Sequence, residues 1–118
     1  MYLGLDLGTS ELKALLLAGD HRIVGMAGVR LTLSRPQPLW AEQAPAQWAD
    51  ALEAVMAELR AQHADALAQV RAIGLSGQMH GAVLLDAAGQ VLRPAILWND
   101  GRSAAECAQL MQAVPALA

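Results

Sequence analysis

The chain has 118 residues, a net charge of −3 and a hydrophobic fraction of 55%, with aromatic residues at only 3%. This length is enough for one compact domain with a hydrophobic core. The mildly acidic charge and the scattered cations argue against sequence-independent binding to nucleic acid or to an anionic membrane surface. We therefore expect no nucleic-acid partner.

Apolar runs such as residues 14–18 are far shorter than the ~20 residues that cross a bilayer, and the N-terminus lacks a signal-peptide pattern. Cys107 is the only cysteine, so an internal disulfide is excluded. These features predict a cytoplasmic protein without a membrane partner. The apolar residues 113–118 favour a piece of a longer protein, because natural ends more often fray into polar residues.

The first third of the chain predicts a three-strand antiparallel meander. An apolar run leads into Asp6, residues 12–18 form a second run, and residues 19–20 supply a tight turn. A third run spans residues 23–34, where apolar and polar residues alternate with the period of a half-buried strand. The expected connections are short, so neighbouring strands should pair antiparallel.

A loop and then a helix should follow the meander. Pro36 and Pro38 remove backbone donors and enforce an extended path. Pro45 suits the first helical turn, and apolar residues recur at helical spacing through residue 60. Trp40 and Trp48 are interpreted as core anchors near the start of this helix.

The remaining elements complete an α/β layered domain. A strand reached through a helix is normally parallel to an earlier strand, so the apolar run after the helix should return parallel. The predicted elements are a strand at 70–76, a hairpin of 82–85 with 90–92 around the turn 86–89, a short strand at 95–98, and a C-terminal helix from 102 to 111 that closes before Pro115.

Three polar clusters each follow an apolar strand. In open α/β sheets ligands gather outside strand ends, so the clusters are expected to converge on one cleft. They are Asp6 with Thr9, Ser10 and Lys13; Gln78 with Met79 and His80; and Trp98 with Asn99, Asp100 and Arg102. Asp100 and Arg102 are expected to pair and to fix their loop.

From the residues alone, the turn after Asp6 fits either a phosphate site or an ordinary hairpin turn. Asp6 suits Mg²⁺, which prefers oxygen ligands and retains several waters, but a turn-capping aspartate is the alternative. Lys13 is either a mobile cation beside phosphate or an exposed residue on a strand.

The second and third clusters also leave two interpretations. His80 lies near Gly77 and Gly81, which allow close backbone approach, and its imidazole suits sugar hydroxyls or a structural hydrogen bond. Trp98 offers an aromatic face to the C–H surface of a sugar, or it fills the core.

Taken together, four segments resemble the FGGY family of carbohydrate kinases, within the ribonuclease-H-like (actin-like ATPase) fold. The first segment alone is weakly specific, but all four in this order are strongly specific, and the resemblance covers essentially the whole chain. The segments are 6–13, 38–48, 77–81 and 92–102, of which the last two are most similar to the bacterial xylulose-phosphorylating members.

The resemblance implies ATP-dependent phosphorylation of D-xylulose at its 5-hydroxyl, giving D-xylulose 5-phosphate, with ATP and Mg²⁺ as cofactors. Glycerol-phosphorylating members carry an arginine–glutamate pair where Met79 and His80 stand, which favours xylulose. By matching position, Asp6 would hold Mg²⁺, Thr9, Ser10 and Lys13 would lie at the nucleotide phosphates, Met79 and His80 would contact the sugar, and Trp98 would form a wall of its pocket.

The resemblance also implies that residues 1–118 are only the N-terminal part of the family's N-terminal domain. The rest of that domain, the second domain and the catalytic aspartate base have no counterpart here, so this polypeptide alone is expected to be inactive. Glu11 replaces a glycine or serine of many members and should point away from phosphate. Exposed apolar surface favours association, with a homodimer as one form.

Alternatives remain within and outside that family. A kinase for ribulose, gluconate or glycerol is the nearest one. A non-catalytic actin-like module that binds ATP without sugar chemistry is the alternative from another class.

Overall fold

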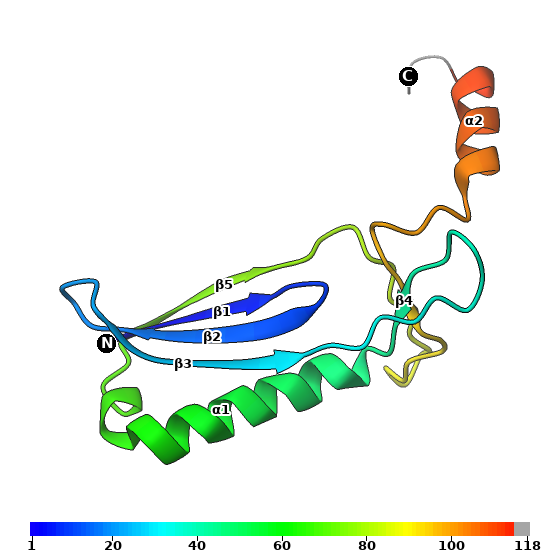
Figure 1. Cartoon of the computed structure of the whole chain (residues 1–118). Helices are drawn as coiled ribbons and strands as arrows, with labels where there is room; N and C mark the ends of the chain where they lie inside the picture. Colours follow the sequence, from blue (N-terminus) through cyan, green and yellow to red (C-terminus); the bar gives the residue numbers. More distant parts are fainter. Residues whose placement is uncertain (115–118) are drawn as a thin grey trace.

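A four-stranded sheet with one long helix on its face forms the body of the chain in the computed structural model, which describes residues 1–114 (Figure 1). The strand order is β3–β2–β1–β5. Strands β1 (Tyr2–Leu7), β2 (Glu11–Leu17) and β3 (Ile23–Arg30) pair antiparallel, and β5 (Ala72–Gly77) returns parallel to β1. The predicted meander and parallel returning strand are confirmed.

Helix α1 (Ala46–Leu67) connects the meander to β5 and covers one sheet face. Its buried residues Ala51, Val55 and Leu59 pack on the apolar face that includes Leu3 and Leu12. The helix runs past residue 60, where prediction ended it, because the alanine-rich continuation has high helix propensity. A non-helical residue, His63 with φ −140°, interrupts this continuation.

A second, two-stranded sheet lies beyond the ends of the main strands. It pairs β4 (Glu42–Gln43) with β6 (Ala95–Ile96), and β4 was predicted as loop. β3 ends at Arg30 and not at Ser34. The Leu31 amide still donates to the Ser10 carbonyl at 2.8 Å, in register with the β2–β3 pairing, but β2 begins only at Glu11, so no β2 residue remains to pair with residues beyond Leu31. Ser34 instead exchanges two backbone hydrogen bonds with Glu42.

The predicted turn at residues 86–89 forms around Asp86. Its carboxylate accepts the amides of Ala88 and Gln90 at 2.8 Å each, and Gly89 has the positive φ that such a turn favours. The flanks pair only through an isolated bridge between Leu85 and Val91 and do not form long strands. The reason is that these flanks are exposed and have no packed face to align them.

Helix α2 (Ala104–Ala113) starts two residues later than predicted and projects away from the sheet (Figure 1). Pro115, which was expected to close it, lies outside the described residues. No helix in the described part of the chain combines the length and the apolarity that a membrane crossing needs.

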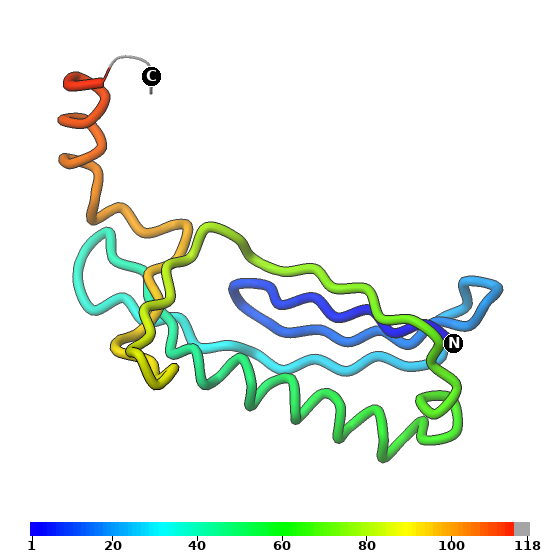
Figure 2. Tube along the Cα trace, turned by 180° about the vertical axis from the view of Figure 1, so that it is seen from behind, coloured from blue at the N-terminus to red at the C-terminus, as the bar shows by residue number. Residues whose placement is uncertain are grey.

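Strand β5 lies at the open edge of the main sheet (Figure 2). Leu75 on this strand is 79% exposed and Ile73 is 60% exposed, although both belong to an apolar run. An apolar edge strand without a cover is uncommon in a folded domain. The expected exposed apolar surface is therefore present.

Candidate functional site

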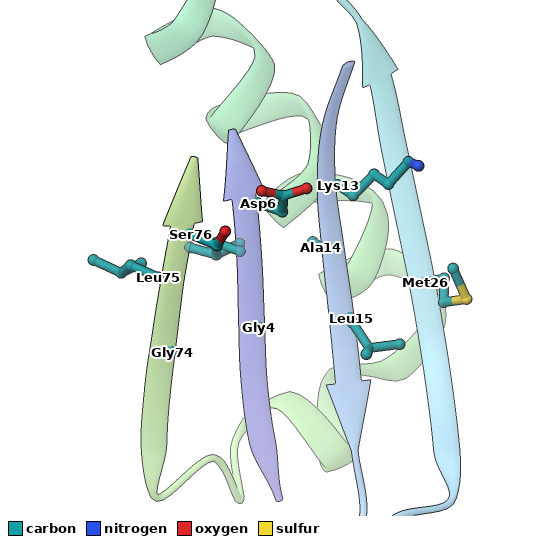
Figure 3. Close-up of a pocket in the computed structure, with 10 residues that line it drawn as sticks. Gly4, Asp6, Lys13, Ala14, Leu15, Met26, Gly74, Leu75 and Ser76 are labelled. Atoms are coloured by element: carbon teal, nitrogen blue, oxygen red, sulfur yellow. The ribbon is translucent and has the colours of Figure 1, made fainter. Parts of the chain in front are cut away.

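Asp6 and Lys13 are direct neighbours across β1 and β2. Leu5, Leu7 and Leu12 belong to the core beneath α1, so alternation puts Asp6 and Lys13 on the opposite sheet face. Figure 3 shows the Asp6 carboxylate between Ser76 of β5 and Lys13 of β2, with α1 behind the sheet. The strand register therefore gathers a carboxylate, a hydroxyl and an ammonium group in one row.

This row lies at one end of a hollow of about 430 Å³ whose other lining is mostly apolar, including Leu15 and Met26. Asp6 is exposed, and no group of three or more potential ligands (His, Cys, Asp or Glu) is found in residues 1–114. Mg²⁺ commonly binds one or two carboxylates together with waters and phosphate oxygens. The single accessible carboxylate of Asp6 therefore fits a Mg²⁺ ion that a phosphate group helps to hold.

The turn from Gly8 to Glu11 joins β1 to β2. The Gly8 amide donates to the Glu11 carbonyl at 3.0 Å, and the Ser10 carbonyl accepts the Leu31 amide. Within residues 1–114 the amides of Thr9 and Ser10 donate to no other protein group. Free successive amides at a turn are suited to an anion.

The Glu11 carboxylate lies 3.6 Å from the Lys13 ammonium. Glu11 precedes Lys13 by two residues on the same strand, and its negative charge partly neutralises that cation. The expectation that Glu11 points away from a phosphate site stays a prediction, because its partner is the lysine assigned to phosphate.

A second hollow, of about 310 Å³, opens beyond the ends of β1 and β5. It brings together all the residues that were expected at the sugar, and it also contains Thr9. Its lining residues are Gly8, Thr9, Gly77, Gln78, Met79, His80 and Trp98. Ser10 lines neither hollow, so the sequence-predicted residues divide into two neighbouring groups.

Hydrogen bonds join the walls of the second hollow. The Trp98 indole N–H donates to the Thr9 hydroxyl at 3.0 Å, and the Thr9 hydroxyl donates to the Gln78 Oε1 at 3.0 Å. The Gln78 amide in turn donates to Gln43 Oε1 at 3.1 Å. Three segments that are distant in sequence therefore meet at Thr9.

Gln43 is the central residue that sequence reasoning missed. Its side chain is fully buried, it donates to the Thr9 carbonyl at 2.6 Å, and it accepts the Trp48 indole N–H at 3.1 Å. A glutamine between Pro38 and Pro45 is expected to be exposed, and no hydrophobic periodicity in this segment marks it as buried. The available clue was its place in the segment 38–48, which matches the family.

His80 has a left-handed backbone, with φ of +63°. This conformation is uncommon for a residue with a side chain, and such residues cluster at functional sites. Gly77 lines the second hollow, and it also has a packing role that was not expected: a Cβ there would lie 3.0 Å from the Leu7 carbonyl oxygen. Gly77 therefore permits close packing of β5 on β1, and His80 itself adopts the strained turn.

A charged cluster holds the segment that carries Trp98. The Arg93 and Arg102 guanidinium groups lie 2.5 and 2.7 Å from Oε1 of the buried Glu42, and Arg102 also pairs with Asp100 at 2.6 Å. Asp100 further accepts the Ala41 amide at 2.7 Å. The predicted Asp100–Arg102 pair is confirmed, and it is anchored to β4.

Trp40 stacks on this cluster and does not enter the core. Its ring centroid lies 3.7 Å from the Arg102 guanidinium carbon, and its side chain is only partly buried. Trp48, by contrast, packs against the core beneath α1 and against a smaller apolar cluster of Ala41, Ala95 and Leu97, as predicted. The prediction for Trp40 was wrong, because a planar cation offers an aromatic face an alternative partner.

The same contacts shift two ionisation equilibria. The hydrogen bond from the Arg102 side chain, more than any other contact, holds the pKa of the Asp100 carboxyl well below its usual range. The same hydrogen bonding, in which the Asp100 carboxylate accepts, raises the pKa of Arg102. Both shifts favour the charged forms that make the pair, so the pair is maintained at lower pH than an unperturbed aspartate would allow.

Comparison with known proteins agrees with this geometry. Residues 1–116 match the N-terminal domain of the FGGY family of carbohydrate kinases, and the chain belongs to this family. The xylulose kinase of Escherichia coli K12 is 54% identical over 115 residues, which are 98% of this chain and 23% of that protein. The chain thus spans about a quarter of the length of this relative.

Solved structures give the same assignment. The xylulose kinase of Rhodospirillum rubrum superposes with a TM-score of 0.89 at 41% identity, covering 95% of this chain and 23% of that one. The gluconate kinase of Lactobacillus acidophilus superposes with a TM-score of 0.85 at 22% identity, covering 94% and 22%. The second likeness shows the fold alone, so the actin-like fold is shared by kinases with different named substrates.

Proposed function

We propose that this chain is the N-terminal part of the N-terminal domain of an ATP-dependent D-xylulose kinase, a cytoplasmic enzyme that uses Mg²⁺. The observation that carries the proposal is the adjacency of the two hollows. The Asp6–Lys13 row is suited to phosphate and Mg²⁺, and the hollow with Met79, His80 and Trp98 is suited to a sugar. The relatives named xylulose kinase support this choice of sugar.

In the proposed reaction the sugar 5-hydroxyl oxygen bonds to the γ-phosphorus of ATP while the bond from that phosphorus to the β–γ bridging oxygen breaks. The products are D-xylulose 5-phosphate, ADP and one proton. Mg²⁺, held by Asp6 when bound, would offset negative charge on the phosphates. Lys13 and the free amides of Thr9 and Ser10 would orient the same oxygens.

The sugar pocket would work by orientation. The partly aromatic hollow offers Trp98 to the C–H face of the sugar, while His80 supplies a polar ring beside Met79. A base must take the proton of the attacking hydroxyl. The family resemblance puts that base, an aspartate, outside these 118 residues, so we propose that the isolated chain is inactive.

The test is an ADP-release assay on the complete gene product and, separately, on the 118-residue chain. D-xylulose, D-ribulose, D-gluconate and glycerol are compared at equal concentration. We expect the complete product to prefer D-xylulose in kcat/KM by at least about tenfold and the short chain to show no sugar-dependent ADP release. A preference for another sugar would replace the substrate, and ATP binding without sugar turnover would indicate the non-catalytic actin-like module.

A further inference from the structure

The hydrogen bonds around Thr9 have a defined direction. A tryptophan indole nitrogen is only a donor, so Trp48 identifies the atom of Gln43 that it contacts as the oxygen. The Gln43 amide nitrogen then faces the Thr9 carbonyl, which is only an acceptor. Both partners fix the same orientation of the buried glutamine.

This orientation determines what Gln78 does. The Gln43 oxygen accepts from the Gln78 amide nitrogen, so the Gln78 oxygen faces Thr9 and requires a donor. Trp98 donates to the same Thr9 hydroxyl from the other side. The Thr9 hydroxyl must therefore give its single proton to Gln78.

That arrangement conflicts with a phosphate role for the Thr9 side chain. A phosphate oxygen near neutral pH is mainly an acceptor and needs a proton from its partner. The Thr9 hydroxyl has no second proton to give, and redirecting it would leave a partly buried amide oxygen unpaired, which is costly. The free backbone amides of Thr9 and Ser10 carry no such conflict.

We propose that the Thr9 hydroxyl belongs to the sugar pocket, where it is a positioning residue that holds the Trp98 ring, and that the turn contacts phosphate through its backbone amides. This inference rests on the proposed function and deepens it. Trp98 is 60% exposed, so its bond to Thr9 is the polar contact that orients the ring over the hollow.

The location of Thr9 gives this bond a further consequence. Its backbone is in the phosphate turn and its side chain lines the sugar hollow. Gln43 donates to its carbonyl, and Gln78 accepts from its hydroxyl. A shift of the turn would therefore move the wall of the sugar pocket.

The test measures the two ligands separately by isothermal titration calorimetry on the complete gene product. D-xylulose is titrated without nucleotide, and ADP with Mg²⁺ is titrated without sugar. We expect Thr9→Val, which is isosteric but lacks the hydroxyl, to weaken D-xylulose binding by about tenfold and to change ADP binding by less than about twofold. Thr9→Ser should recover most of the lost sugar affinity.

The matched control is Thr32→Val, the same change at an exposed threonine whose described hydrogen bonds use only its backbone. It should alter neither affinity. A double-mutant cycle with Trp98→Phe, which deletes the indole N–H, checks that Thr9 acts through Trp98. The two changes should be strongly non-additive for D-xylulose. Circular dichroism melting confirms that each variant is folded.

Loss of ADP affinity in Thr9→Val, with D-xylulose binding intact, would overturn the inference and return the hydroxyl to the phosphate site. Additive effects of Thr9→Val and Trp98→Phe would also overturn it. If the wild-type protein binds another sugar of the panel instead, the proposed substrate fails while the same variants, titrated with that sugar, still decide the role of Thr9. If it binds none, both proposals fail.

Discussion

Oε1 of Glu42 lies 2.7 Å from Nη2 of Arg102, and the two residues are 60 positions apart in the chain. The same oxygen also receives Arg93. This contact ties β4 to the segment that follows Trp98, so the geometry of the candidate sugar hollow depends on a buried carboxylate that lines neither of the two hollows described above.

Glu42→Gln should destabilise the chain by about 2 kcal/mol, because two guanidinium groups lose their shared anion while Arg93 regains part of its hydration. Urea unfolding of the 118-residue chain measures the change in the free energy of unfolding. Glu53→Gln, at an exposed position of α1, is the matched control and should stay within about 0.5 kcal/mol. Equal effects of the two substitutions would contradict the anchoring role of Glu42.

Acid should weaken the chain through Asp100. Its pKa is lower in the folded state than the ordinary value of about 3.9, so the unfolded state binds the proton more readily. The stabilisation is therefore complete above the ordinary value and is lost progressively as the pH falls below it. Urea midpoints between pH 6 and pH 2.5 should show a shallower acid decline for Asp100→Asn than for wild type; parallel curves would count against this prediction.

Gly77→Ala should destabilise the chain by about 1–3 kcal/mol, because the added Cβ would lie 3.0 Å from the carbonyl oxygen of Leu7 and 3.2 Å from the Cβ of Leu7. Gly74→Ala is a matched control on the same strand, since nothing lies within 4 Å of its added Cβ. Thermal unfolding should separate the two variants clearly. A similar loss in both would mean that strand propensity, and not close packing, explains the glycine.

Lys13→Gln should weaken ADP binding by the complete gene product by about tenfold and leave D-xylulose binding nearly unchanged, since the ammonium group lies in the row with Asp6. Its ion pair with Glu11 is exposed, so stability should change by less than about 0.5 kcal/mol. Lys13→Arg, which keeps the charge, should retain more affinity. Unchanged ADP titrations in Lys13→Gln would remove this lysine from the nucleotide site.

The isolated chain should self-associate through β5, because this strand has an unpaired edge and Leu75 is largely exposed. Size-exclusion chromatography with light scattering across a concentration series should detect a homodimer. Leu75→Lys should shift the chain to monomer. Leu92→Lys, at an exposed leucine outside the sheet, should not; a dimer that survives Leu75→Lys would point to another surface.

The sequence by itself determined the elements whose signals are local. Alternating apolar residues and short turns set the meander, helical spacing set α1, and Asp86 with Gly89 set a turn, because each depends on neighbours within a few residues. The family assignment was equally accessible, since four short segments in one order carry it. The pairing of Asp100 with Arg102 needed only a spacing of two residues.

Only the tertiary structure decided how those segments meet. Strand β4 exists because Glu42 and Gln43 pair with Ile96 and Ala95 of β6, and no local pattern encodes such distant pairs. Their side chains find partners 51 and 35 positions away. Thr9 belongs to the candidate phosphate turn in sequence, yet its hydroxyl contacts Gln78 and Trp98. A hydrogen bond depends on where two side chains lie in the folded chain. The tertiary structure, and not the spacing of residues in the sequence, therefore separates the candidate site into two hollows.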